Sequence, residues 1–398
     1  MTTTDRLRLG VALEGAGWHP AAWREESSRP TELFTPNYWA DLVRRADAAG
    51  IDFATIEDSF AVQSGSPFGA DDRTDEVRGR LDALLIASRV APVTRRIGLI
   101  PTVTTTHTEP FHISTGIATL DYTSLGRAGW QPKVSPRADE ARHFGRRDIP
   151  EFTDREDPRL WEIAAELFAE AEDVVEAVRR LWDSWEDDAE IRDVATDRFL
   201  DADKLHTVDF ERRSFRVRGP SITPRPPQGQ PVIAALAHAE IPYRFAAASA
   251  DVVFVTPQDI AGATAILDEV RRAERDVART GEPLRVFADL VVFLDADEPA
   301  SDRLERLDAL GRPLSSDARI FAGSAAQLAD EIAALGELGY AGVRLRPGVA
   351  TDDLPRIADD LVPELRRRDL LAGDGGSLRG VLGLPTSVPN RYAPALAG

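Results

Sequence analysis

The chain has 398 residues, and its 48 lysines and arginines against 67 aspartates and glutamates give a formal net charge of −19. This acidic balance argues against broad contact with nucleic acid or anionic membranes. The sequence has no cysteine, which excludes disulfides, thiolate metal sites and a cysteine nucleophile. Residues 1–9 lack an apolar signal segment, and no window approaches about 18 consecutive apolar residues, so we expect a cytoplasmic protein without a membrane span.

Short β-branched segments alternate with amphipathic helical segments along the chain, a pattern typical of a parallel α/β fold. The first strand is predicted at 9–13, and a helix follows from Pro36, capped by Thr35 and ended by Gly50. Further strands are predicted at 53–56, 95–106, 126–131, 231–235, 251–255, 284–294 and 339–347. Further helices are predicted at 81–90, 110–120, 158–184, 260–280, 300–310, 325–338 and 351–368.

About eight strands alternating with helices predict a (β/α)8 TIM barrel with insertions, formed as a single domain over 1–398. Residues at about 186–228 are charged or proline-rich and weakly periodic, which indicates an insertion, and 373–398 is a Gly/Pro-rich tail. The alternative is two doubly wound domains. Their nucleotide-binding forms lack support, because GxGxxG does not follow the first strand and GxxxxGK[ST] does not occur.

Catalytic groups of such a barrel come from the carboxyl ends of its strands. Polar side chains predicted at these ends are Glu14, His19, Glu57, Asp58, Thr104, Thr105, Thr106, His107, Trp130, Gln131, Lys133, His238, Glu240, Arg344 and Arg346. The six histidines show none of the HxH, HExxH or HxxxH spacings, so we predict no metal site. No GxSxG elbow occurs, and no second acid stands at a clean strand end to pair with Glu57 for glycoside cleavage.

Three segments carry longer motifs: YWADLVRRADAAGIDFATIEDS at 38–59, TVTTTHTEPFHISTGIATLDYTSLGR at 102–127 and GRAGWQPKVSPRADEARHFG at 126–145. In this order they resemble segments of the flavin-dependent luciferase-like monooxygenases, whose third segment has the form GRxGWN…NFG. The branch that they resemble includes the nitrilotriacetate, dibenzothiophene-sulfone and long-chain alkane monooxygenases. The similarity extends over roughly 9–370, which is nearly the whole chain.

The resemblance implies reduced FMN, supplied by a separate NAD(P)H:flavin reductase, and O2 as the co-substrate that oxygenates a small organic molecule. It also implies a homo-oligomer and a lid that keeps water from the flavin, formed by 186–210 or by the loop before Leu81. His19 and His107 would face the substrate as candidate catalytic acids or bases. The implied cofactor contacts are Asp58, Thr104, Thr106, Trp130, Gln131, His143 and His238.

The chain departs from the family pattern on the phosphate side. The family's AGxSxxG after the fifth strand reads ALAHAEIPYR at 235–244, without the glycines and the serine. The family's asparagines are replaced by Gln131 and His143. Because missing glycines prevent close backbone approach to an anion, cations such as His143 or His238 would have to hold the phosphate.

These departures leave two alternatives open. The first is a barrel of the same family with a degenerate phosphate site, acting as a non-redox binding protein or using another flavin such as a deazaflavin. The second is a non-redox barrel enzyme, such as a hydrolase or a lyase, for which metal and acid-pair patterns are missing.

Overall fold

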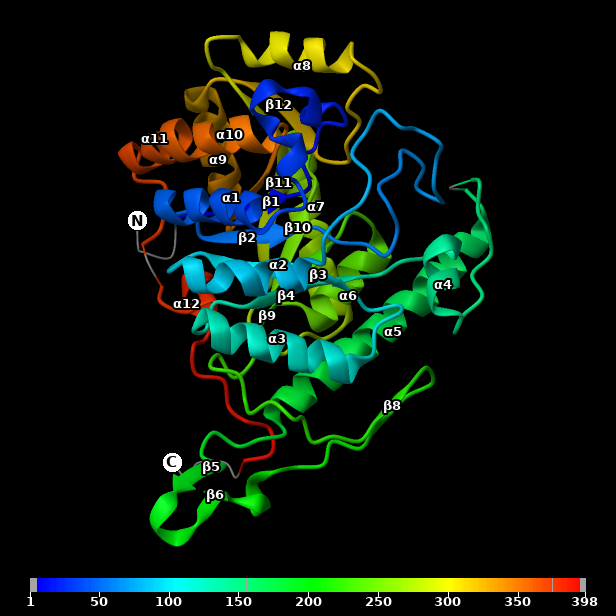
Figure 1. The fold of residues 1–398 in the computed structure, drawn as a ribbon, viewed down its shortest axis with the longest axis vertical. Helices are drawn as coiled ribbons and strands as arrows, with labels where there is room; N and C mark the ends of the chain where they lie inside the picture. Colours follow the sequence, from blue (N-terminus) through cyan, green and yellow to red (C-terminus); the bar gives the residue numbers. More distant parts are fainter. Residues whose placement is uncertain (1–5, 155, 374, 394–398) are drawn as a thin grey trace.

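Eight parallel strands close into a barrel in the computed structural model, which describes residues 6–154, 156–373 and 375–393 (Figure 1). The strands are β1 (Arg8–Leu13), β2 (Phe53–Ile56), β3 (Gly98–Thr104), β4 (Gly129–Lys133), β9 (Val232–Leu236), β10 (Val252–Val255), β11 (Arg285–Leu294) and β13 (Gly342–Pro347). Neighbours pair in this order, and β13 pairs back with β1. The predicted TIM barrel is confirmed, and the alternative of two open sheets is excluded.

Helices surround the barrel and connect its strands (Figure 1). They are α1 (Pro36–Ala49), α2 (Ala83–Val90), α3 (Pro110–Ser124), α4 (Ala138–Phe144), α5 (Pro158–Asp183), α6 (Glu240–Ser249), α7 (Ile260–Asp276), α8 (Ala300–Asp308), α9 (Ala325–Leu338), α10 (Ala350–Arg356) and α11 (Val362–Arg367). As predicted, Thr35 caps α1 by accepting a hydrogen bond from the backbone of Tyr38, and Gly50 ends the helix. Among the described residues, no helix combines the length and the apolar character needed to cross a membrane.

The half of the barrel interior at the amino ends of the strands, which we call the lower half, is apolar. The C-terminal tail closes the barrel at this end. Phe53 fills the space beside Gly10, where even a single β-carbon would overlap its ring. Phe53 belongs to a cluster of buried aromatic and aliphatic side chains, and helix α12 (Leu378–Val381) places Leu378 against this cluster. The Gly/Pro-rich tail therefore supplies part of the core at the amino ends of the strands.

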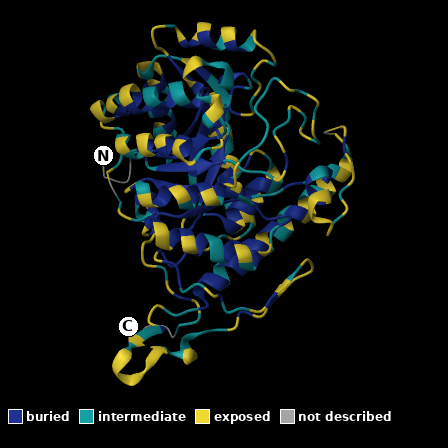
Figure 2. Ribbon diagram, in the orientation of Figure 1, coloured by how far each residue is buried: buried dark blue, intermediate teal, exposed yellow. Residues whose placement is uncertain are grey.

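The segment predicted as an insertion lies outside the barrel as two short hairpins (Figure 1). Strands β5 (Glu190–Asp193) and β6 (Arg198–Leu200) form the first, and β7 (Phe210–Glu211) and β8 (Arg216–Val217) form the second. The β5–β6 hairpin projects from the molecule and carries many exposed residues (Figure 2).

A further strand, β12 (Arg319–Gly323), is not predicted from the sequence. It pairs with the second half of β11.

Candidate active site

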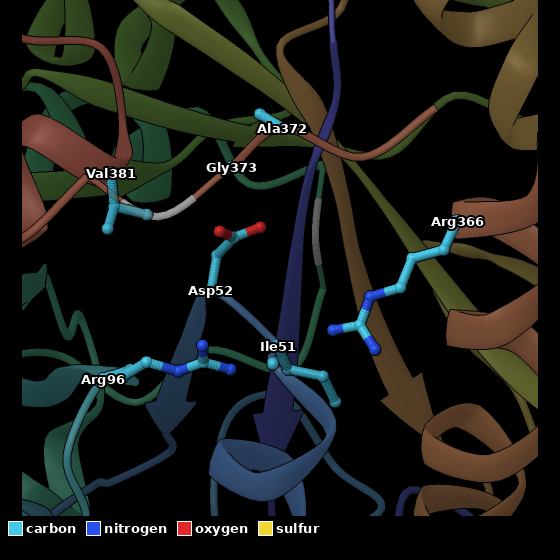
Figure 3. A pocket seen from close by; sticks show the side chains of 8 residues that line it. Ile51, Asp52, Arg96, Arg366, Ala372, Gly373 and Val381 are labelled. Atoms are coloured by element: carbon cyan, nitrogen blue, oxygen red, sulfur yellow. The ribbon is translucent and has the colours of Figure 1, made fainter. Parts of the chain in front are cut away.

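Cavities occur at both ends of the barrel, and their positions relative to the strands distinguish them. One of about 230 Å³ lies at the amino ends, where Arg96 and Arg366 approach Ile51 and Asp52 from opposite sides (Figure 3). Two others lie at or beside the carboxyl ends of β1, β2 and β3. Because TIM-barrel enzymes place their chemistry at the carboxyl ends, we locate the candidate site there.

A buried network of charged side chains occupies the barrel interior below this end. Asp289 on β11 accepts hydrogen bonds from Nε and Nη2 of Arg344 on β13, at 2.7 and 2.5 Å. The same carboxylate accepts from Arg346, whose Nη1 also donates to Asp317 at 2.9 Å. Burial alone would lower the pKa of Arg346, but the attraction of Asp289 and Asp317 raises it. Arg346 is therefore a permanent cation inside the barrel.

Gln131 joins this network, which fixes the orientation of its amide. Its oxygen accepts from Nη1 of Arg344 at 2.8 Å, and its nitrogen donates to Thr102 at 2.9 Å and to Glu57 at 3.3 Å. The side chain is almost fully buried. The predicted contact of Gln131 with a flavin stays a prediction, and the structure adds that Gln131 links Glu57 to Arg344.

Two carboxylates stand at the mouth under the loop that follows β2. Glu14, after β1, lines a small cavity with Glu57 and lies 3.4 Å from Nη2 of Arg80 and 3.3 Å from the amide nitrogen of Gln63. Burial raises the pKa of Glu14, and the neighbouring charge of Glu57 adds to this effect. Glu14 therefore keeps a proton to higher pH than an ordinary glutamate does.

An aromatic cluster lies on the rim beside the carboxylates. The ring of His107, after β3, stacks on Phe144 at 5.0 Å between centroids, and Phe60 meets Phe144 at 4.8 Å. Phe60 and Phe144 are exposed, whereas His107 is 8% exposed. Within the described part of the chain, the buried Nε2 of His107 has no hydrogen-bond partner. Burial lowers the pKa of this imidazole.

Three of the predicted cofactor contacts, Asp58, Thr104 and Thr106, lie at or next to the carboxyl ends of strands, and a fourth, Trp130, lies inside β4. Asp58 accepts from the backbone of Ser59 and of Ala83, at 2.7 and 2.8 Å, and so holds the start of α2. Thr106 accepts from the backbone of Ser135. Thr104 is buried in β3, and the indole of the fully buried Trp130 donates to the backbone oxygen of Val103.

The remaining predicted residues are dispersed. His19 is buried. Its Nδ1 accepts a hydrogen bond from the backbone of Ala21, and its Nε2 is bonded to Asp308, the last residue of α8. His143 is exposed on α4, and His238 is exposed between β9 and α6. Of the predicted histidines, His107 alone has a buried ring atom without a described partner, while both nitrogens of His19 are occupied.

The charged interior can be predicted only in part from the sequence. The sequence places Arg344 and Arg346 in the last strand but does not single out their partner Asp289. The available signal was the alternation of arginines in GVRLRP, since residues two apart in a strand share one face. Two cations on the inner face of a buried strand require anions from neighbouring strands.

Comparisons with known proteins agree with this architecture. A family model described as luciferase-like monooxygenase matches residues 16–353. Nitrilotriacetate monooxygenase component A of Aminobacter aminovorans is 33% identical over 319 residues, 79% of this chain and 68% of that protein. N-acetyl-S-(2-succino)cysteine monooxygenase of Bacillus subtilis (strain 168) is 31% identical over 306 residues, 77% of this chain and 65% of that protein. The match thus spans about two thirds of each relative's length.

Solved structures give the same result for the fold. A long-chain alkane monooxygenase superposes with a TM-score of 0.82 at 22% identity, covering 95% of both chains. The EDTA monooxygenase from Chelativorans sp. BNC1 superposes with a TM-score of 0.78 at 20% identity, covering 96% of this chain and 99% of that one. The family model matches residues 16–353, which is most of this chain, so the chain belongs to the luciferase-like monooxygenase family.

Proposed function

We propose that the protein is an FMN-dependent monooxygenase that oxygenates a small organic substrate with O2, using reduced flavin from a separate reductase. The observation that carries the proposal is the 33% identity to nitrilotriacetate monooxygenase component A over 79% of this chain. The words "component A" indicate a system of more than one component, which supports a reductase partner. A solved relative of the fold, the oxygenating constituent of 3,6-diketocamphane monooxygenase, is in complex with FMN.

The rim of the barrel fits the ring system of a flavin. Phe60 and Phe144 expose aromatic surface there. A planar heteroaromatic group at this position would cover both exposed rings. When bound, reduced flavin supplies the electrons for reaction with O2.

The start of α6 does not fit the phosphate of FMN. Its N-cap position is Ala239, which leaves the first backbone amides without a side-chain cap, but Glu240 places a carboxylate in the first turn. The positive end of a helix dipole favours anions, but this carboxylate repels them. A phosphate group therefore needs cations elsewhere on the rim.

The remaining tasks of the site fall to residues of this chain. The loop that contains Gln63 and Arg80 lies over Glu14 and limits the access of water to it. Burial raises the pKa of Glu14, so this carboxyl is our candidate for holding a proton at the mouth. Asp58 fixes α2 beside the mouth, and Lys133 donates to the backbone oxygen of Asp58 at 2.7 Å, which ties β4 to β2.

The altered segment at 235–244 favours a second candidate, in which the same rim binds a different coenzyme of the flavin type, such as a deazaflavin. An F420-dependent secondary alcohol dehydrogenase shares the fold, with a TM-score of 0.60 at 12% identity. A non-redox binding protein is the remaining form of this candidate. Both forms predict weak or absent binding of FMN.

Anaerobic titration separates these functions. Purified protein is titrated with reduced FMN and, separately, with a deazaflavin, and tryptophan fluorescence reports binding. Saturation by reduced FMN in the micromolar range is expected, together with oxygenation of a test substrate when a flavin reductase, NADH and O2 are added. Failure to saturate with FMN at tens of micromolar would reject the proposal, and saturation with the deazaflavin alone would favour the second candidate.

A further inference from the structure

A cavity of about 130 Å³ lies just outside the rim, between α3 and α5. Its walls come from the turn after β3, the residues after α4, the face of α5 and the β7–β8 turn. We call it the α3–α5 cavity. Drug-sized ligands occupy pockets of about 300–1,000 Å³, so this space suits a single functional group rather than a whole coenzyme.

Two guanidinium groups face this cavity because of a turn at the end of α4. Gly145 ends that helix with φ 63°, a left-handed conformation that favours glycine, and Arg146 and Arg147 follow directly. Both arginines line the α3–α5 cavity. Arginine presents several donors in a planar fork, which matches the oxygens of carboxylate and phosphate.

The glutamates beside these arginines leave donors available. Nη2 of Arg147 donates to Glu170 on α5 at 2.5 Å, and this carboxylate is 12% exposed. The bond holds the guanidinium in place, while in the described residues Nε and Nη1 of Arg147 make no hydrogen bond. Arg146 pairs with Glu109, but their side chains are 65% and 57% exposed, so water screens this pair and an incoming anion competes with it.

Two further features of the cavity favour an anion. Helix α3 starts there with Pro110 in its first turn, and its N-cap residue Glu109 makes no side-chain cap bond but pairs with Arg146, so no capping carboxylate offsets the partial positive charge of the helix start. Independently, His107 lines the cavity, and its Nε2 is buried and has no partner among the described residues. A buried polar atom without a partner is costly, and an anion whose oxygen reaches this atom would satisfy it.

We infer that the α3–α5 cavity is an oxyanion subsite, which takes one carboxylate or phosphate group on Arg146, Arg147 and His107. The existence of the subsite does not depend on the proposed function. Only the identity of the molecule that carries the anion rests on it. One source is the phosphate of FMN, which the start of α6 repels, and the other is a carboxylate of the substrate. The subsite adjoins the β3 end of the mouth, so an anion held there anchors a ligand whose remainder lies on the aromatic rim.

The test uses the full chain and four variants. Arg146→Gln/Arg147→Gln removes both cations, and His107→Phe keeps the ring that stacks on Phe144 while removing the nitrogen. Arg142→Gln is the matched control, because Arg142 is an exposed arginine of α4 that pairs with Glu151 and does not line the cavity. Arg147→Lys tests whether a single positive charge replaces the fork.

Calorimetric titration with succinate and with inorganic phosphate measures the subsite without any flavin. We expect saturable binding of at least one anion to the wild type and to Arg142→Gln. The double glutamine variant is expected to bind about tenfold or more weakly, and Arg147→Lys and His107→Phe to fall in between. Absence of binding to the wild type, or equal binding by the double variant and the wild type, would overturn the inference. Far-UV circular dichroism checks that each variant is folded.

Parallel titrations with reduced FMN and reduced riboflavin identify the source of the anion. If the subsite holds the flavin phosphate, the double variant weakens FMN binding about tenfold or more and leaves riboflavin binding unchanged. If it holds a substrate carboxylate, both flavins bind the double variant as they bind the wild type, while succinate binding is lost. Succinate binding without binding of either flavin would uphold the subsite and reject the proposed function.

Discussion

Replacement of Asp289 by alanine is expected to lower the free energy of unfolding by about 3–5 kcal/mol, the range found when one partner of a buried ion pair is removed. Asp289 and Arg344 are 0% exposed, and Asp289 accepts hydrogen bonds from both Arg344 and Arg346. Without it, the remaining anions are Glu57, 3.5 Å from Arg344, and Asp317 beside Arg346. Two guanidinium groups would then share two more peripheral carboxylates in a medium that screens them poorly.

Urea unfolding of the wild type and of Asp289→Ala, followed by tryptophan fluorescence and circular dichroism, measures this loss. Asp317→Ala is the control, since its side chain is 44% exposed and accepts a single hydrogen bond from Arg346. We expect the control to lose about 1 kcal/mol or less. A loss below about 1 kcal/mol for Asp289→Ala, or equal losses for the two variants, would refute the reasoning that burial determines the cost.

The remaining predictions concern three parts of the fold. Burial holds the pKa of His19 below its ordinary value, so the unfolded chain binds a proton more readily, and wild-type stability falls as pH drops below about 6.5. Urea midpoints at pH 7.5 and 5.5 should therefore differ less in His19→Gln, and equal differences would contradict this. Asp58→Ala should cost about 1 kcal/mol through the lost bond to Ala83, measured by the same unfolding assay. Leu378→Ala should cost about 2–5 kcal/mol if the tail closes the barrel, and a negligible loss would show that it does not.

The barrel itself could be predicted because its strands are short apolar segments separated by helices with clear ends. The strand at Phe53–Ile56 agrees in both bounds, and Thr35 and Gly50 mark the ends of α1 as expected. Strand β12 is not predicted from the sequence. It pairs with the carboxyl-terminal half of β11, a contact that exists only after the barrel has closed. Helix α12 escaped prediction because one helical turn is too short to show a periodic pattern.

The site was predictable at the level of strand ends but not of contacts. His107 and Glu57 stand at the mouth as expected, because their positions follow from where β3 and β2 end. The partners of Gln131 come from β3, from β13 and from the residue after β2, which meet only across the closed barrel. Asp289 cannot be predicted as part of the network, because a single acid inside an apolar strand gives no periodic signal. Its burial is explained only by its two arginine partners.

The division of the barrel interior into two layers determines where a ligand can bind. Phe254 belongs to the apolar lower layer, and the guanidinium of Arg344 lies 3.9 Å from its ring centroid, so the charged layer rests directly on the apolar one. The charged layer in turn holds Gln131 and, through it, Glu57. Side chains of the protein thus occupy the barrel axis up to the level of Glu57. A ligand of the barrel mouth therefore has no room along the axis below Glu57, which is why we propose the rim as the binding place and expect changes in the aromatic cluster or in Arg147 to alter binding without disturbing the fold.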